Sequence, residues 1–290
     1  MDLLDLQLIL SAVGGGIFGA ALGPLPAFIF CGVVVLAGEV ALIAAGTGVI
    51  TTSIGFGTFF GPHIAFAGGV AAAAYAARKG YLGSGRDILT PLMKLGRWDV
   101  LLVGGIFGVG AFFINGLLAE TGMPSDTIAI TVIISAIIAR ILWSDTGVFG
   151  RHDPKKSSSR WRPPEEVAWL PFQMHFGQLL LIGLGMGLAS AYVTILTGSL
   201  FFGYGIAAAS LIILEIKGAG PVTHHIALPA SIGAIATGSI VMGGVFGILG
   251  AFAGEFFARL FYDWGDTHID PPACAIAVLT TVAILFLGYA

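Results

Sequence analysis

The sequence predicts an all-α polytopic membrane protein with about ten transmembrane helices, arranged as two inverted five-helix repeats with interrupted or re-entrant segments. Of its 290 residues, 57% are hydrophobic and only 10% are charged, whereas soluble domains carry roughly a quarter charged residues. The mean hydropathy is +0.96, and the 44 glycines lie mostly inside apolar runs, where they let membrane helices approach closely. So little charge cannot cover a surface in water, and we expect lipid to be the solvent.

Five apolar segments are predicted as spans of the first half. The first follows the acidic start MDLLDL, which lacks the basic residues of a signal peptide. The second contains one carboxylate, Glu39, and the third begins after Pro62 with mostly small residues. The five segments are residues 8–22, 27–45, 63–77, 100–119 and 127–143. Several are shorter than the roughly 20 residues of a perpendicular span, so their bounds are approximate.

A polar stretch rich in charge, serine and proline divides the chain into two halves. We predict a first repeat over residues 1–145, a cytoplasmic linker over 146–172 and a second repeat over 173–290. The spans of the second half are residues 176–196, 201–216, 225–240, 241–262 and 273–289. The least defined boundary lies within 222–262, because no polar loop separates its two helices.

The basic residues predict the orientation of these spans, because cytoplasmic loops carry an excess of Lys and Arg. They follow the third span and fill the linker, and Arg140, Lys217 and Arg259 close the fifth, seventh and ninth spans. With ten spans, all 13 Lys and Arg residues fall on one side. This pattern predicts a multi-pass protein of the cell membrane with both termini outside.

Internal similarity predicts that the second half repeats the first. Residues 7–20 align with 178–191, residues 104–119 with 243–258, and residues 127–142 resemble 273–287. The tripeptide HIA occurs at 63–65 and again at 225–227, in the matching order. Because each half has an odd number of spans, the second half is expected to be inverted. Such transporters and channels hold their site near the midplane, where the repeats meet.

Interrupted segments occur at matching places in the two halves and indicate the site. Residues 46–62 are too polar for a lipid-facing helix and too apolar for an ordinary loop, so we expect a re-entrant segment that lines a cavity. Residues 215–231 are the shorter counterpart. The predicted substrate or ion pathway consists of Glu39, Thr47, Thr51, Thr52, Ser53, Thr58, His63, Asn115, Thr223, His224, His225 and Glu255.

Histidine and a deep carboxylate are the groups in this set best suited to carry a proton. Ionisable side chains inside a membrane are functional candidates by default, and histidine exchanges protons near neutral pH. His63, His225 and Glu39 are therefore the predicted proton carriers. The alternatives are a histidine that only satisfies backbone groups at a helix start and a paired, structural Glu39. Asn115 and Glu255 have interhelical hydrogen bonding as their alternative.

The stretch YDWGDTHIDPP concentrates Asp263, Asp266, His268 and Asp270. Carboxylates with a histidine are weak candidates for a metal site. The same residue types also make a tight turn followed by a helix cap, which is the alternative.

These observations predict an integral membrane transporter or channel for a small solute or ion, either passive or coupled to ions or protons. No nucleotide-binding loop and no cofactor motif occurs in the sequence, so no cofactor is expected. The expected partners are membrane lipid, the solute and possible further copies of the chain, and no nucleic acid. The alternatives are an intramembrane enzyme that acts on a lipid-linked substrate through the Asp/His cluster, and a non-catalytic subunit of a larger complex.

Overall fold

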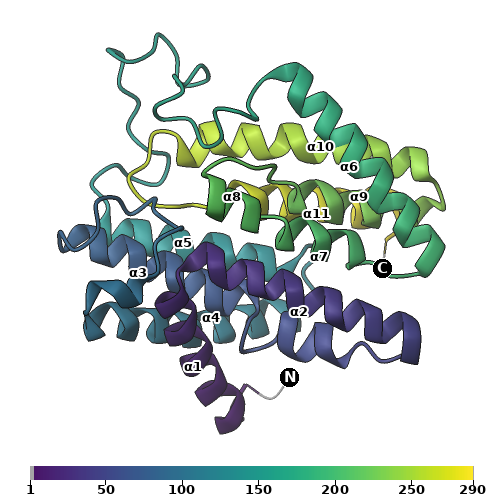
Figure 1. Ribbon diagram of the computed structural model, residues 1–290, viewed down its shortest axis with the longest axis horizontal. Helices are drawn as coiled ribbons and strands as arrows, with labels where there is room; N and C mark the ends of the chain where they lie inside the picture. Colours follow the sequence, from purple (N-terminus) through teal and green to yellow (C-terminus); the bar gives the residue numbers. More distant parts are fainter. Residues whose placement is uncertain (1–2, 290) are drawn as a thin grey trace.

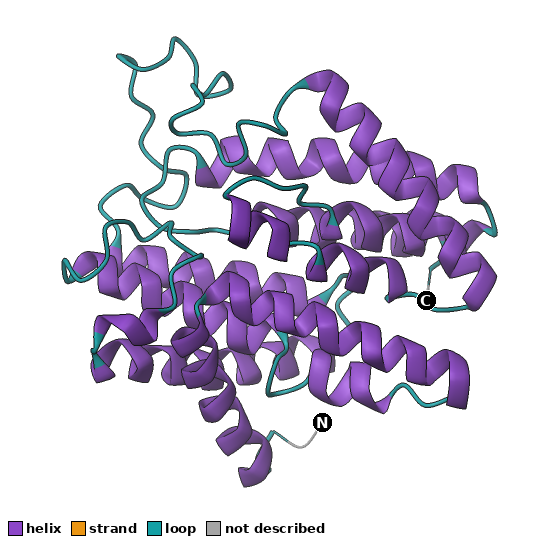
Figure 2. Cartoon of the chain, in the orientation of Figure 1, coloured by secondary structure: helices purple, strands orange, loops and turns teal. Residues whose placement is uncertain are grey.

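The computed structural model describes residues 3–289. Helices make up 69% of the chain, and no strand occurs within the described residues (Figures 1 and 2). The prediction of an all-α protein is therefore confirmed. The helices are α1 (Leu6–Leu22), α2 (Pro24–Ala45), α3 (Ala67–Arg78), α4 (Trp98–Glu120), α5 (Thr127–Trp143), α6 (Phe176–Thr197), α7 (Phe202–Ala209), α8 (Ile212–Lys217), α9 (His224–Thr237), α10 (Ile240–Phe257) and α11 (Pro271–Leu287). Four short turns of non-α helix are η1 (Thr51–Gly55), η2 (Pro62–Phe66), η3 (Leu92–Leu95) and η4 (Ala258–Tyr262).

Four helices within the described residues are long and apolar enough to cross a membrane by length and composition. They are Pro24–Ala45, Trp98–Glu120, Phe176–Thr197 and Ile240–Tyr262, which joins α10 to η4. Three further apolar helices, α1, α5 and α11, have 17 residues each. The predicted span 201–216 is divided into α7 and α8, because the chain turns at Ser210. The Ser210 hydroxyl donates to the Ala207 carbonyl, and such local bonds compete with helix propagation.

The helices form two layers, α1–α5 and α6–α11, which follow each other along the chain (Figure 1). In the first layer α1 crosses α4, where a Cβ added at Gly16 would overlap the Gly104 carbonyl and lie 3.1 Å from the Gly108 Cα. In the second layer α6 crosses α10 through three glycines at the aligned positions, Gly187, Gly243 and Gly247. Small residues let helix backbones touch in this way, where dispersion contacts stabilise a membrane protein.

Two helix pairs make the most extensive contacts between the layers. Helix α2 contacts α7, where a Cβ added at Gly32 would lie 2.6 Å from the Ala209 amide nitrogen and one at Gly205 would lie 2.9 Å from Leu36. Helix α5 contacts α11, and the Ser125 hydroxyl just before α5 donates to the Ala277 carbonyl at 3.0 Å. Both pairs bring together one helix from each half of the sequence.

The segment between α2 and α3 folds back along α2. Helix α2 ends at Gly46, whose positive φ of 70° reverses the chain. The Thr51 hydroxyl then donates to Glu39 at 2.7 Å, and the Cys31 thiol donates to the Gly55 carbonyl at 3.1 Å. The segment therefore passes Glu39 and then Cys31 in order, next to the interior of α2, before η2 begins at Pro62.

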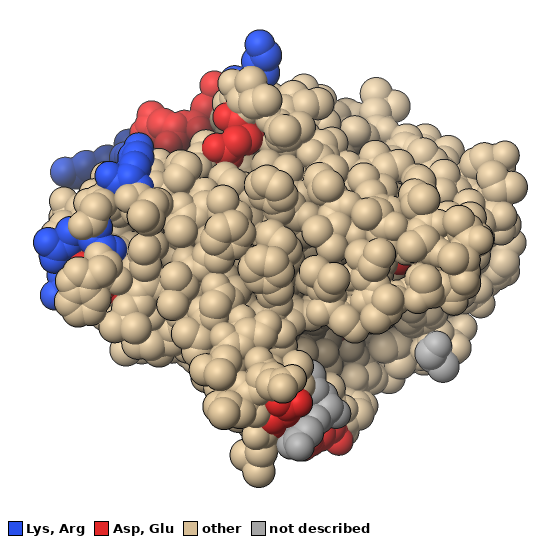
Figure 3. All heavy atoms as spheres, turned by 60° about the horizontal axis from the view of Figure 1, so that its bottom comes forward, with Lys and Arg blue, Asp and Glu red and all other residues tan. Residues whose placement is uncertain are grey.

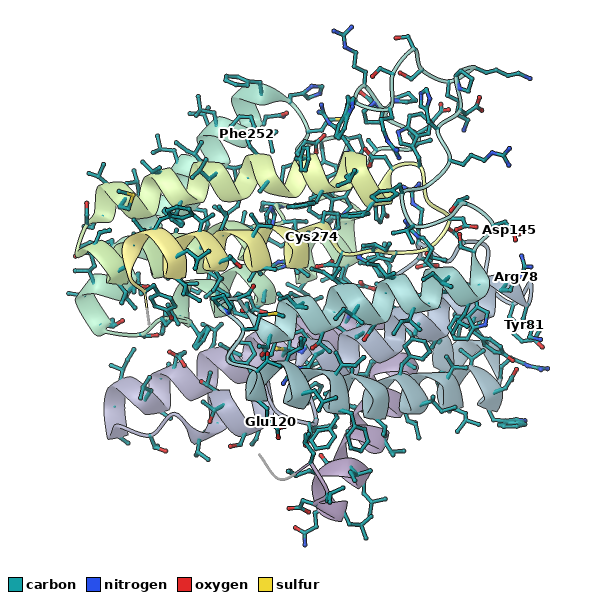
Figure 4. The ribbon with its side chains drawn as sticks, turned by 180° about the vertical axis from the view of Figure 1, so that it is seen from behind. Arg78, Tyr81, Glu120, Asp145, Phe252 and Cys274 are labelled. Carbon is teal, nitrogen blue, oxygen red and sulfur yellow. The ribbon has the colours of Figure 1, made fainter. Side chains whose placement is uncertain are left out.

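One end of the molecule carries most of its loops, and we call it the loop-rich end: residues 79–97, 144–175 and 263–270. The Lys and Arg side chains visible in Figure 3 gather at one end of the molecule. Arg86 donates to the Val167 carbonyl at 3.0 Å and Arg259 to the Trp161 carbonyl at 2.8 Å. The ion pair of Arg78 with Asp145 lies at the same end, away from Cys274 on α11 (Figure 4).

Arg140 is the most deeply buried charged group of the loop-rich end, with 0% of its surface exposed. Its guanidinium donates to the Thr267 hydroxyl at 2.8 Å, to the Thr267 carbonyl at 2.5 Å, and to the carbonyls of Val148 and Phe261. These bonds tie the end of α5 to the segment before α11. All four acceptors are neutral, so they satisfy the donors without pairing the charge.

Candidate functional site

A cavity of about 120 Å³ lies between the two layers. Its lining comes from both halves and is mostly apolar, with four Asp and His side chains from three separate places in the sequence. The lining residues are Leu25, Phe28, Phe56, Pro62, Phe66, Ile88, Asp126, Ile128, Ala129, Val132, Trp169, Phe201, Tyr204, Leu211, Leu214, Val222, His224, Leu228, His268, Asp270, Pro272, Ala273 and Ile276.

Four helical segments begin at this cavity. Asp126 caps α5 by accepting the Ala129 amide at 2.8 Å, and Asp270 caps α11 by accepting the Ala273 amide at 2.8 Å. Pro62 begins η2, which leads into α3, and His224 is the first residue of α9. Helix N-termini carry partial positive charge and free amide donors. Two of these starts are therefore satisfied by carboxylates that lie in the cavity wall.

His268 and Asp270 form a buried pair in the wall. The His268 Nε2 lies 3.0 Å from the Asp270 Oδ1, and His268 is only 1% exposed. An ionised carboxylate oxygen accepts hydrogen bonds and donates none, so the proton of the neutral His268 ring lies on Nε2. The His268 Nδ1 has no hydrogen-bond partner within residues 3–289, so in the neutral imidazole it is an acceptor without a donor.

His224 lies among aromatic rings. It is 6% exposed, and its ring centroid is 4.7 Å from that of Phe28 and 6.1 Å from that of Tyr204. Its Nδ1 also lacks a hydrogen-bond partner in the described part of the chain. Asp270 is close enough to interact with it electrostatically. His224 is thus a buried polar group of the wall whose hydrogen-bonding capacity is unmet.

Glu39 joins the re-entrant segment to the second half, outside the cavity lining. It is 1% exposed, and it accepts the Thr51 hydroxyl at 2.7 Å and the Ser199 hydroxyl at 2.6 Å. Ser199 in turn accepts the Phe202 amide at the start of α7. The interior position of Glu39 is what the sequence predicts, and its partners make it a link between residues 46–62 and the turn that precedes α7.

His63 and His225 each lie inside their own layer rather than in the cavity wall. Both are buried, and their Nδ1 atoms have no partner among the described residues. A Cβ added at Gly254 of α10 would lie 2.5 Å from the His225 Nε2, so this ring fills the space that the glycine leaves. Of the two adjacent histidines, the structure places His224 in the wall.

The other predicted pathway residues are dispersed. Thr47, Thr52 and Ser53 are exposed and Thr223 is buried. Thr58 donates to the Ser11 hydroxyl of α1. The Asn115 Oδ1 is buried without a partner in the described chain. Glu255 pairs with Arg259 at 2.8 Å, one turn along the same helix.

The four candidate metal ligands lie along one extended segment, and only His268 and Asp270 meet. Asp266 accepts the Thr146 hydroxyl at 3.0 Å and also bonds Ser144, whereas Asp263 accepts the Trp169 amide at 2.9 Å. No group of three or more His, Cys, Asp or Glu that could hold a metal ion occurs among residues 3–289.

The two loop aspartates have opposite electrostatic environments. Burial raises the pKa of Asp263 to about 6, although the Trp169 amide and the nearby Arg86 act to lower it. For Asp266, partial burial acts to raise the pKa, but hydrogen bonds from Ser144 and Thr146 outweigh it, and the pKa is lowered.

Sequence reasoning did not find Asp126, Tyr204 and Trp169 as residues of the wall. Asp126 carries a local signal, an Asp immediately before an apolar helix, but that signal predicts only a cap. Trp169 belongs to the linker, whose last part is buried: Ala168 and Leu170 are in the core, and Gln173 exchanges two hydrogen bonds with the backbone of Val222. Trp169 and Leu170, two large apolar residues in a mostly polar linker, were the signal in the sequence that could have indicated this burial.

Comparison with known proteins gives one family. A family model described as "Family of unknown function (DUF7973)" matches residues 1–157 and, separately, residues 150–289. No curated protein and no solved structure matches the chain.

Proposed function

The chain belongs to this family of unknown function (DUF7973), and from that premise we propose that it is an integral membrane transporter or channel for a small solute. The observation that carries the proposal is the cavity between the layers, with walls from both halves of the sequence and four Asp and His side chains. Ionisable groups are expensive at membrane depth and mark substrate or ion pathways there.

We further propose that the two layers are inverted repeats. The glycine contacts of α1 with α4 recur at aligned positions of α6 and α10, and Asp126 and Asp270 cap the last helix of each half in the same way. The two successive family matches support a duplication at the same boundary. A five-span unit inserted twice reverses its direction, which places the site where the repeats meet.

In this proposal the ten spans comprise the four long helices, the shorter apolar helices and the interrupted segments. Helices that start at the cavity do not need full membrane length, because the segments before them enter the protein interior. The loop-rich end is the cytoplasmic side, because the basic residues gather there.

Glu39 is the group that we expect to respond to a transported or coupled proton. It receives hydroxyl donors from Thr51 in the re-entrant segment and from Ser199 before α7. Protonation removes one acceptor site from the carboxylate and weakens the charge-assisted bonds. Loss of one bond would therefore release the re-entrant segment from the second half.

Cysteine accessibility tests whether the cavity belongs to a hydrated pathway. Cys31 and Cys274 are first replaced by alanine, and Ala129→Cys and Ala273→Cys then introduce small thiols into the wall, on α5 and α11. In proteoliposomes we expect both to react with a membrane-impermeant thiol reagent, and reaction at either to block solute uptake.

The matched control is Leu181→Cys on the exposed face of α6, where the side chain is 70% exposed and should face lipid. It should stay unreactive. If Ala129→Cys and Ala273→Cys are equally unreactive in folded protein, the cavity is not a water-filled pathway and the proposal is wrong.

A further inference from the structure

We propose, on the premise that the cavity holds the transported solute, that this solute is a small organic cation: an ammonium group attached to an apolar body. The charge of the wall is the first reason. Its described residues include two aspartates, Asp126 and Asp270, and no Lys or Arg. Both carboxylates interact electrostatically with the Tyr204 hydroxyl.

Two of the helix starts at the cavity favour the ionised form of these carboxylates and are closed to an anion. A bare helix N-terminus attracts anions. Here the amides of Ala129 and Ala273 are already taken by Asp126 and Asp270. The helix dipoles stabilise the ionised form of the two side chains, and the two negative charges then favour a cation in the space between the layers.

The wall offers hydrogen-bond acceptors beside its two carboxylates. Asp270 fixes the proton of His268 on Nε2 and leaves Nδ1 as an acceptor without a donor. His224 is only 6% exposed. Its Nδ1 has no hydrogen-bond partner within the described chain. An ammonium group has donors and no acceptor, which is the complement of this set.

Aromatic rings form the rest of the recognition surface. The ring of Phe28 lies 5.7 Å from that of Phe66 and 6.2 Å from that of Tyr204. The ring of Phe56 lies 5.6 Å from Tyr204 and 4.9 Å from Phe201. A cation is attracted to the faces of such rings within about 6 Å of their centroids, while their edges and the aliphatic residues accommodate an apolar body.

The size of the cavity limits the body. Its volume is about 120 Å³, and one water molecule needs roughly 10–15 Å³ of such space. The cavity therefore has room for a molecule of roughly ten non-hydrogen atoms.

Three probes with one aromatic ring and different charge test this inference: benzylammonium, benzyl alcohol and phenylacetate. Their binding to the purified full-length chain is measured by titration calorimetry at pH 7. We expect benzylammonium to bind at least about tenfold more tightly than benzyl alcohol, since hydrogen bonds to a charged group are the stronger ones, and phenylacetate to bind most weakly.

Asp126→Asn removes one charge and keeps a side chain that caps helices well. It should weaken benzylammonium binding about tenfold and leave benzyl alcohol binding unchanged. Asp5→Asn is the matched control, because Asp5 caps α1 outside the cavity by accepting the Gln7 amide, and it should bind all three probes as the unchanged chain does. Helical content measured by circular dichroism shows that both variants are folded.

The cation proposal is overturned if benzylammonium does not bind, if either other probe binds as tightly, or if Asp126→Asn leaves its affinity unchanged. Uptake of labelled benzylammonium into proteoliposomes distinguishes a failure of the cation proposal from a failure of the transport proposal. Binding without uptake would keep the cation site and reject transport. Uptake that occurs for the three probes regardless of charge would keep transport and reject the cation site.

Discussion

At the scale of residues, the loop before α11 contains two aspartates whose charges affect stability in opposite directions. Burial disfavours the ionised form of Asp263, and its folded pKa of about 6 is above the usual value near 4. The folded chain then binds more protons than the unfolded chain between these two values. The stabilising contribution of a protonated Asp263 is complete below about pH 4 and is lost as the pH rises through about 6.

Asp263→Asn should remove the loss of stability that the unchanged chain suffers as the pH rises, which amounts to about 3 kcal/mol at most. We expect the variant to gain stability relative to the unchanged chain as the pH rises from 4.5 to 7.5, measured by thermal unfolding in detergent. Asp266→Asn should change stability in the opposite direction, because hydrogen bonds lower the pKa of Asp266. This variant should be less stable than the unchanged chain at pH 7.5. Equal pH profiles for the two variants would contradict the assigned environments.

The adjacent histidines 224 and 225 illustrate how far sequence determines a site at this scale. Both were expected in the pathway, together with His63. The structure places the His224 ring beside Phe28 in the wall and the His225 ring against Gly254 of α10. Neighbouring side chains of a helix point about 100° apart, so the exact start of α9 decides which one enters the cavity. That start depends on tertiary contacts, which composition and spacing do not encode.

At the scale of elements, glycine contacts set the distance between crossing helices. Gly16→Ala places a Cβ against the Gly104 carbonyl, and backbone cannot move aside as a side chain does. We expect a loss of about 1–3 kcal/mol in unfolding free energy. Gly187→Ala, whose added Cβ would lie 3.0 Å from the Gly243 carbonyl, should cost less.

Gly14 and Gly185 are the matched controls on the same two helices, because an added Cβ at either has nothing within 4 Å. Alanine there should be neutral or slightly stabilising, since it favours the helix. Thermal unfolding of the four variants checks the order. A loss at Gly14→Ala equal to that at Gly16→Ala would contradict the close contact of α1 with α4.

The sequence alone predicted which segments are helical better than it predicted how deep inside the molecule each helix begins. Apolar runs and glycines indicated the helices. Residues 46–62 were expected to re-enter the membrane; their contacts with α2 through Thr51 and Gly55 are observed, and re-entrance stays a prediction. The break of α7 from α8 was not predicted, because residues 201–216 are mostly apolar. Asp126 was not predicted as a site residue, because a capping signal concerns only the helix that follows it. Its position in the cavity wall depends on how α5 packs against α11, which the local sequence does not show.

At the scale of the whole molecule, the two-layer arrangement and the charge distribution make a prediction about topology. Thr47 lies between α2 and η1, and Lys155 lies in the linker at the loop-rich end; both are exposed. In a background without Cys31 and Cys274, a membrane-impermeant thiol reagent should label Thr47→Cys in intact cells. It should label Lys155→Cys only after the membrane is permeabilised.

Labelling of both positions in intact cells would contradict the proposed topology, and so would labelling of Lys155→Cys alone. An epitope tag at either end of the chain gives an independent control, because ten spans place both tags outside. Ten spans were predicted from ten apolar segments and from the placement of the basic residues, whereas helix length and composition alone identify four candidates among residues 3–289. In the proposed arrangement, helices that begin inside the protein are too short to meet a length criterion.

The burial of Arg140 has a consequence for biosynthesis. Its acceptors Phe261 and Thr267 follow it by 121 and 127 residues, and a ribosome adding about 5–20 residues per second needs roughly 6–25 seconds to supply them. During that interval the guanidinium of a nascent first half has to stay hydrated. A chain that terminates prematurely in the linker therefore lacks three of the four acceptors that allow this guanidinium to be buried.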